Sequence, residues 1–214
     1  MKTRPHLPLR LILSGVLIAL VLASAVLWFT RAEISGGTDG GSSAAIALPA
    51  GTKIGGAFTL IDDQNRPVSD ETYRGHWLLV YFGYTFCPDV CPTTLQTIAT
   101  ALDRLGKSGA GITPLFITVD PARDTPAVMA RYVHQFDSRI IGLTGSEAQI
   151  AEAAKAYRVY YQKETPKDGT PYTMDHSSFL YLMDRQGRLA ALFGPQTTAA
   201  ELAAAIGQKL GQDK

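Results

Sequence analysis

The stretch WLLVYFGYTFCPDVCP, residues 77–92, decides the expected fold of this 214-residue chain. It begins with the apolar, aromatic run Trp77–Phe82, which is typical of a buried strand. It ends with Cys87 and Cys91, the two cysteines of the sequence, which lie four residues apart. If the chain passes here from strand into helix, both sulfurs face one side, because residues four apart share a helical face. Two convergent sulfurs can bind one soft metal ion or close a disulfide.

A helix is expected directly after the cysteines. Pro92 suits a first helical position, and apolar residues keep helical spacing from there to Gly106, namely Leu95, Ile98, Ala99, Leu102 and Leu105. Cys91 would precede this helix, where unpaired backbone N–H groups and the positive end of the helix dipole stabilise negative charge. We therefore expect Cys91 to favour the thiolate.

The rest of the chain alternates between strand-like and helix-like segments. The expected strands are Phe58–Ile61, Leu115–Val119, Phe179–Met183 and Leu189–Phe193, the last two paired as a hairpin. The expected helices begin at Thr125 with Pro126, at a capping box of Ser146 with Gln149, and at a capping box of Thr198 with Glu201. Residues 159–173 have the composition of an exposed, mobile loop. This order predicts an α/β, thioredoxin-like domain with a mixed central sheet.

The N-terminal sequence predicts a single membrane anchor. Three basic residues, Lys2, Arg4 and Arg10, precede an uncharged apolar run that ends at Phe29. Its roughly 19 residues would span about 28 Å as a helix, close to the thickness of a bilayer core. A segment rich in Gly and Ser follows, with the composition of flexible coil. The predicted parts are a short cytoplasmic N-terminus at 1–10, a transmembrane helix at 11–30, a flexible linker at 31–49 and the thioredoxin-like domain at 50–214.

A cleaved signal peptide is the alternative, because Ala23-Ser24-Ala25 has the small-x-small pattern of a cleavage site. The apolar run continues through Trp28 and Phe29, which favours an uncleaved anchor. The excess of basic residues before the run places the N-terminus in the cytoplasm. Since either alternative exports the domain, we expect a single-pass protein of the inner or cytoplasmic membrane with its soluble domain on the periplasmic side.

Charge and cysteine content argue against a nucleic-acid-binding protein and against a disulfide-rich scaffold. Residues 34–214 contain 16 basic and 18 acidic residues, a net charge near −2, so nothing in this part attracts nucleic acid. One cysteine pair is too sparse for the disulfide framework of a small secreted domain. The pair is expected to be redox-active or metal-binding, with a short structural disulfide as the alternative.

One of the four histidines could complete a metal site. Two thiolates suit Cu(I), and an imidazole would make the site three-coordinate. His6 precedes the anchor, His76 precedes the strand that leads to the cysteines, and His134 has the context of an exposed helical residue. His176 lies where the long loop meets the next strand, beside Asp175, which could orient the ring. Spacing alone does not decide whether His176 binds a metal or is a polar residue that begins the strand.

Four segments together resemble the Sco/SenC family of membrane-tethered copper chaperones that act in cytochrome c oxidase assembly. They are YFGYTFCPDVCP at 81–92, VDPARDT at 119–125, YRVYY at 157–161 and DHSS at 175–178. The resemblance implies that Cys87, Cys91 and His176 bind one copper ion, as Cu(I) or Cu(II). It also implies delivery of that ion to the binuclear copper site of cytochrome c oxidase, on its copper-bearing subunit, with other copper chaperones or thiol reductants as further partners.

Two further pairs of residues are expected to have structural roles rather than to bind copper. Asp120 and Asp124 match acidic positions of the family, but turn formation and helix initiation explain them adequately. Met174 and Met183 are expected to be loop and core residues rather than copper ligands.

Three other functions were weighed against copper delivery. The first is a thiol-disulfide oxidoreductase that reduces the cysteines of the copper acceptor or of another exported protein. The three-residue spacer between Cys87 and Cys91, and the lack of a role for His176 in thiol exchange, argue against a general oxidoreductase. Peroxide reduction is disfavoured because the cysteines form a pair, and structural zinc because it normally takes four protein ligands. We expect a copper-binding assembly factor rather than an enzyme.

Overall fold

The computed structural model describes residues 45–49 and 51–213. The expected anchor at 11–30 and most of the expected linker lie outside the described residues, so both stay predictions. Among the described helices, none combines the length and the apolar composition that a membrane span needs. The last residues of the expected linker lie against the domain, because Ala45 pairs with Phe193 and the Ile46 N–H donates to the Leu192 carbonyl over 2.6 Å.

The described residues form a mixed α/β structure. The strands are β1 (Thr59–Asp62), β2 (Pro67–Ser69), β3 (Trp77–Gly83), β4 (Ile112–Thr118), β5 (Ile141–Thr144), β6 (Tyr161–Glu164), β7 (Thr173–His176), β8 (Leu180–Met183) and β9 (Leu189–Phe193). The helices are α2 (Val90–Leu105), α3 (Pro126–Val133), α4 (Glu147–Ala156) and α5 (Ala199–Gln212), with short 3-10 helices η1 (Asp70–Tyr73) and η2 (Gly106–Gly111).

The strand β3 lies inside the main sheet and is buried along its whole length. Within the described residues, the order of this sheet is β2-β1-β5-β4-β3-β8-β9. β3 pairs in parallel with β4 and antiparallel with β8, so the expected mixed sheet is confirmed. Because both faces of such a strand are covered, apolar side chains are required on each, and the run Trp77–Phe82 is apolar throughout for this reason.

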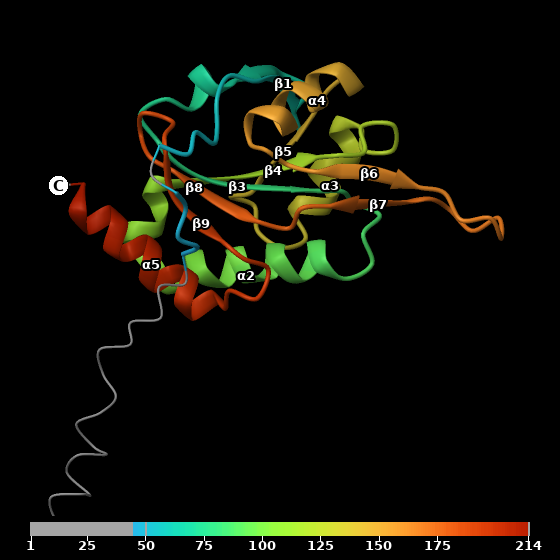
Figure 1. The fold of residues 1–214 in the computed structure, drawn as a ribbon. Coiled ribbons are helices and arrows are strands. Elements are labelled where there is room, and N and C mark those ends of the chain that lie inside the picture. Colours follow the sequence, from blue (N-terminus) through green and yellow to red (C-terminus); the bar gives the residue numbers. More distant parts are fainter. Residues whose placement is uncertain (1–44, 50, 214) are drawn as a thin grey trace, which may run out of the picture. The chain divides into compact units, whose positions relative to one another are not determined.

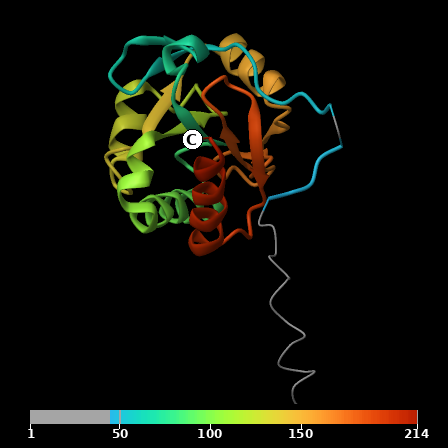
Figure 2. The same cartoon turned by 90° about the vertical axis from the view of Figure 1, so that its left-hand side faces the viewer.

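Helices cover both faces of the sheet. α2 and α5 lie side by side against one face, and α4 lies on the opposite face (Figures 1 and 2). The three expected N-caps are confirmed: Thr125 accepts a hydrogen bond from the Val128 N–H, and Ser146 and Thr198 form capping boxes with Gln149 and Glu201. The expected hairpin near the C-terminus is also confirmed as β8 paired with β9.

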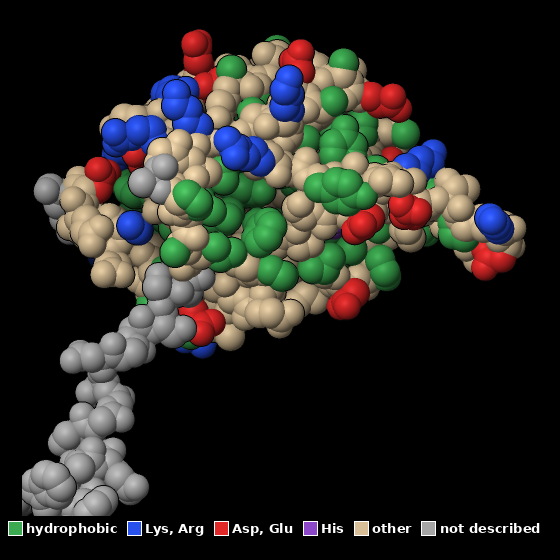
Figure 3. All heavy atoms as spheres, in the orientation of Figure 1, with side chains coloured by type: hydrophobic (Ala, Val, Ile, Leu, Met, Phe, Trp, Pro, Cys, Tyr) green, Lys and Arg blue, Asp and Glu red, His purple; other side chains and the backbone are tan. Residues whose placement is uncertain are grey.

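The expected loop at 159–173 is instead largely a hairpin. β6 and β7 form a separate two-stranded antiparallel sheet in which Tyr161 lies opposite His176. The hairpin projects from the body of the domain, with side chains of both charges at its outer end (Figures 1 and 3). The loop prediction is wrong for these strands because β6, with the sequence YQKE, is almost fully exposed and lacks the apolar alternation that marks a strand buried on one face.

Two short strands, β2 and β5, were also missed. β2 has three residues and β5 has four, one of which is Gly142, so neither shows a recognisable period. Their positions are set by pairing with β1 and β4, which only the tertiary structure supplies.

Candidate metal centre

The two cysteines lie where the chain passes from β3 into α2. Cys87 is in the loop between these elements, where its N–H donates to the Tyr84 carbonyl over 3.4 Å. Cys91 is the second residue of α2, which begins at Val90 after the N-cap Asp89 rather than at Pro92 as predicted. The sulfurs therefore converge through the turn before the helix, not through a shared helical face.

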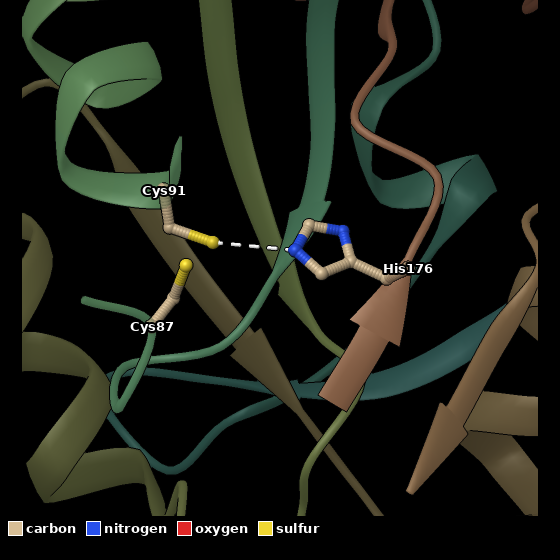
Figure 4. Close-up of side chains that lie close together, drawn as sticks. All are labelled: Cys87, Cys91 and His176. Atoms are coloured by element: carbon tan, nitrogen blue, oxygen red, sulfur yellow. Dashed lines mark hydrogen bonds between the residues drawn. The ribbon is translucent and has the colours of Figure 1, made fainter. Parts of the chain in front are cut away.

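His176 comes from the distant end of β7, 85 residues after Cys91, and its imidazole points toward both sulfurs (Figure 4). Its Nε2 lies 3.5 Å from Cys91 Sγ. The three candidate donor atoms, one each from Cys87, Cys91 and His176, lie within 4.8 Å of one another. Within the described residues, no other group of three His, Cys, Asp or Glu side chains is placed to share a metal ion.

The orientation of His176 is set by its neighbours. Its Nδ1 lies 3.2 Å from the Ser177 carbonyl, which can accept a hydrogen bond from it, so Nε2 is the ring nitrogen that faces the sulfurs. The edges of two aromatic rings confine the imidazole, with centroid distances of 6.3 Å for Tyr81 and 5.8 Å for Tyr84. Asp175, which was expected to orient the ring, is exposed, and the ring nitrogen Nδ1 faces the Ser177 carbonyl instead.

The cysteines have opposite electrostatic environments. Cys91 is fully buried, and desolvation raises the pKa of its thiol, as does the neighbouring charge on Cys87. Cys87 is partly exposed, and the hydrogen bond from Cys91 lowers its pKa against the effect of desolvation, helped by a hydrogen bond with His176. The prediction that Cys91 favours the thiolate is wrong, because the burial of Cys91 outweighs the helix N-terminus. Of the two thiols, Cys87 therefore has the lower pKa.

Tyr81 was not among the predicted site residues. Its hydroxyl donates to Cys91 Sγ over 3.7 Å, and burial raises the pKa of the phenol, which keeps that proton in place. Gly83, the last residue of β3, also lies against this sulfur: a Cβ at this position would lie 2.7 Å from Cys91 Sγ. Neither contact has a sequence signal, because β3 is apolar or aromatic at nearly every position.

Asp124 forms the turn that was expected of it and also holds the cysteine loop. The carboxylate is fully buried and accepts hydrogen bonds from the Thr85 N–H over 3.0 Å, from Thr85 Oγ1 over 2.5 Å and from Thr118 Oγ1 over 2.5 Å. Desolvation raises the pKa of this carboxyl. Its backbone N–H closes the turn on the Asp120 carbonyl over 3.0 Å. Thr85 is two residues before Cys87, so Asp124 holds the loop that contains Cys87 in place.

The remaining candidate residues lie away from the cluster or at its rim. His134 is 47% exposed and has its Nε2 3.6 Å from Asp63 Oδ2, and His76 precedes β3 at the end opposite the cysteines. His6 lies outside the described residues. Met183 is buried in the core as expected, whereas Met174 lies on β7 and not in a loop.

Two of the three donors, Cys87 and His176, line a cavity of about 610 Å³. The other lining residues are Tyr84, Pro88, Asp89, Val90, Thr173, Met174, Asp175, Ser178, Pro195 and Gln196. Two sulfurs and one imidazole nitrogen are the soft and borderline ligands that Cu(I) prefers. Three protein ligands also leave room for a donor from another molecule. The arrangement therefore fits a bound Cu(I) ion.

Comparison with known proteins agrees with this geometry. The SCO1/SenC family model matches residues 47–211. The chain belongs to the SCO1/SenC family. It is 44% identical over 160 residues to the protein sco1 of Schizosaccharomyces pombe, covering 72% of this chain and 60% of that protein. It is 42% identical over 151 residues to the SCO2-like protein of Rickettsia prowazekii, covering 70% and 74% respectively.

Solved structures of the family also match. The ScoI of Arabidopsis thaliana with copper bound has a TM-score of 0.71 and 39% identity, covering 74% of this chain and 99% of that one. The ScoI of Bradyrhizobium japonicum with copper bound has a TM-score of 0.67 and 46% identity, covering 73% and 99%. Some curated relatives are longer than the matched region: the chain spans 60% of the S. pombe protein and 52% of the human SCO1 homologue. Copper is thus a bound ligand in homologous Sco structures.

Proposed function

We propose that this protein is a membrane-tethered copper chaperone that binds one copper ion through Cys87, Cys91 and His176. The observation that supports it is the convergence of three soft or borderline donors within 4.8 Å, from segments 85 residues apart. The copper-bound structures of its relatives support the choice of metal. The domain at 50–214 is the copper-binding part, and the anchor at 11–30 holds it at the periplasmic face of the inner or cytoplasmic membrane.

The acceptor that we propose is the binuclear copper site of cytochrome c oxidase, as the resemblance of the motifs implies. Delivery requires ligand exchange and no turnover chemistry. A donor of the acceptor enters through the cavity beside Cys87 and His176, and the protein ligands leave one at a time. Cys87 is partly exposed and Cys91 is fully buried, so we expect the imidazole and Cys87 to be displaced before Cys91.

The test is Cu(I) binding by the reduced full-length chain, measured by competition with a chromophoric Cu(I) chelator. We expect one Cu(I) per chain, no tight binding after Cys87→Ser or Cys91→Ser, and an affinity lowered at least about a hundredfold after His176→Ala. His134→Ala is the matched control, since this exposed histidine lies outside the cluster. An affinity unchanged by His176→Ala would reject the proposed ligand set.

Delivery and location need separate tests. A strain that lacks the protein should lose oxidase activity and regain it with added copper, and the His176→Ala variant should not complement it. Alkaline phosphatase fused after residue 214 should be active, because the enzyme needs an exported, oxidising compartment for its disulfides. An inactive fusion would exclude the periplasmic location.

A thiol-disulfide oxidoreductase is the second candidate. One observation favours it: a partly exposed cysteine with a lowered pKa, Cys87, beside a buried one with a raised pKa, Cys91, is the arrangement of an attacking thiol and a resolving thiol. This alternative predicts that His176→Ala retains full function in the cell. Complementation by that variant therefore separates the two functions.

A further inference from the structure

The hairpin β6–β7 provides His176 and lies outside the main sheet, so no ladder of that sheet holds it in place. Its outer end is charged and solvated (Figure 3). At the outer end of its strands, directly before β7, Tyr172 makes three contacts: its hydroxyl donates to Asp120 Oδ1 over 2.9 Å, its carbonyl accepts from Arg123 Nη1 over 2.9 Å, and Lys163 Nζ lies 3.8 Å from its ring centroid.

Arg123 contacts both segments that provide metal ligands. Its guanidinium carbon lies 3.7 Å from the ring centroid of Tyr172, four residues before His176, and 4.7 Å from that of Phe86, directly before Cys87. It also lies 5.7 Å from the ring of Tyr84, which packs against the imidazole of His176. These distances are within the range of cation–π attraction.

The orientation of Arg123 is itself fixed. The side chain is paired through Nε with Asp120, whose side chain is 4% exposed. Arg123 retains 24% exposure, and its Nη2 is buried without a hydrogen-bond partner in the structure, as expected for a guanidinium packed against aromatic faces. Asp120 and Arg123 belong to the loop between β4 and α3, which provides no ligand.

We propose that Arg123 is a positioning residue that holds the His176 hairpin against the cysteine loop through Tyr172 and Phe86, and thereby sets the rate at which copper is released. This inference rests on the proposed function. With two ligands on one side of the contact and the third on the other, separation of the hairpin removes one ligand of three. The Arg123–Tyr172 contact opposes that separation without touching the metal.

The test combines two variants of the contact with a background that lacks the third ligand. Arg123→Met removes the cation but also removes the ion-pair partner of the buried Asp120, which could unfold the loop. Tyr172→Leu removes the ring and keeps the ion pair of Arg123 with Asp120, so it serves as the second variant. Arg131→Met is the matched control, because it removes an exposed arginine of α3.

We expect both variants to increase the rate of Cu(I) transfer from the full-length protein to a chelator by about tenfold. Tyr172→Phe keeps the ring and should increase it by less than about threefold. In the His176→Ala background, Arg123→Met and Tyr172→Leu should change the rate no further, since the ligand on which they act is gone. An equal increase in that background would overturn the proposal, because the contact would then act on the cysteine loop alone.

A readout without copper separates this proposal from the proposed function. In the apo protein, the Tyr84 ring and the His176 imidazole, with centroids 5.8 Å apart, should give nuclear Overhauser effects, and backbone order parameters should report the mobility of the hairpin. We expect Arg123→Met and Tyr172→Leu to weaken the former and lower the latter for β6–β7, with no change for Arg131→Met. Unchanged values would overturn the proposal even if copper binds. A wild type that fails to bind Cu(I) would reject the proposed function and leave the decision on the contact to these spectra.

Discussion

Substitution of Gly83 by Ala tests how closely the fold itself shapes the metal centre. The added Cβ would lie 2.7 Å from Cys91 Sγ, 2.7 Å from Phe116 Cε2 and 3.2 Å from Phe116 Cζ. Because non-bonded heavy atoms prefer roughly 3.5–4.0 Å, the sulfur and the ring must each move by about 1 Å. Cys91 and Phe116 are both fully buried, so neither has free space to move into.

Overpacking of this kind typically costs about 1–3 kcal/mol of unfolding free energy. The effect on the metal should be larger than the effect on stability. Metal–ligand distances tolerate only about 0.2 Å, so a displacement of Cys91 Sγ near 1 Å takes one ligand out of position. We expect the Cu(I) affinity of Gly83→Ala to fall by about 10- to 100-fold.

The assay is urea unfolding of the reduced apo protein together with Cu(I) competition. Gly211→Ala is the matched control, since a Cβ at this helical position meets nothing within 4 Å. That control should keep wild-type affinity and gain up to about 1 kcal/mol of stability. In a Cys91→Ala background the cost of Gly83→Ala should fall, because one of its two close contacts is gone. A Gly83→Ala protein with wild-type stability and affinity would refute the reasoning.

Four further predictions concern the same region. Asp124→Ala should lower the unfolding free energy by about 2–4 kcal/mol, because it leaves the hydroxyls of Thr85 and Thr118 and one backbone N–H without an acceptor. Asp124→Asn should cost less than half of that. Urea unfolding measures both costs, and equal costs would contradict the hydrogen-bond explanation. In the apo protein, iodoacetamide at pH 6 should alkylate Cys87 far faster than an ordinary thiol and should spare Cys91, as read by mass spectrometry. The pKa of Cys87 is lower in the folded than in the unfolded protein. The stability that its thiolate contributes is therefore complete above the ordinary thiol pKa and is lost as the pH falls toward the folded pKa. The stability difference between wild type and Cys87→Ser should accordingly shrink from about pH 9 to about pH 5. Cu(I) at about 100 times its dissociation constant should stabilise the folded protein by about 2.7 kcal/mol, and a chelator should reverse the rise in Tm; a Tm that does not respond to Cu(I) would contradict binding to the folded state.

The reliable parts of the sequence prediction are those with a local cause. The run Trp77–Phe82 marked β3, because a strand covered on both faces has to be apolar at every position. The three N-caps marked α3, α4 and α5, because a cap bonds to an N–H only two or three residues away. The hairpin β6–β7 was not predicted, since its strands are largely exposed and have no local sequence pattern.

The candidate site likewise has a part that the sequence indicated and a part that it did not. Residue type indicated Cys87 and Cys91 as possible metal ligands and the motif resemblance added His176, and the structure brings these three side chains together. Their relative pKa values were predicted wrongly, since the helix N-terminus is visible in the sequence but the burial of Cys91 is not.

By itself, the sequence determined the central strand, the caps of α3, α4 and α5 and the apolar segment before the domain, all of which depend on neighbours within a few residues. Tertiary structure alone decided the closeness of the imidazole to sulfurs 85 residues away, which cysteine ionises, and the contact of Arg123 with two separate segments. The physical reason is that distance and desolvation depend on which segments pack together, and packing is a property of the whole chain.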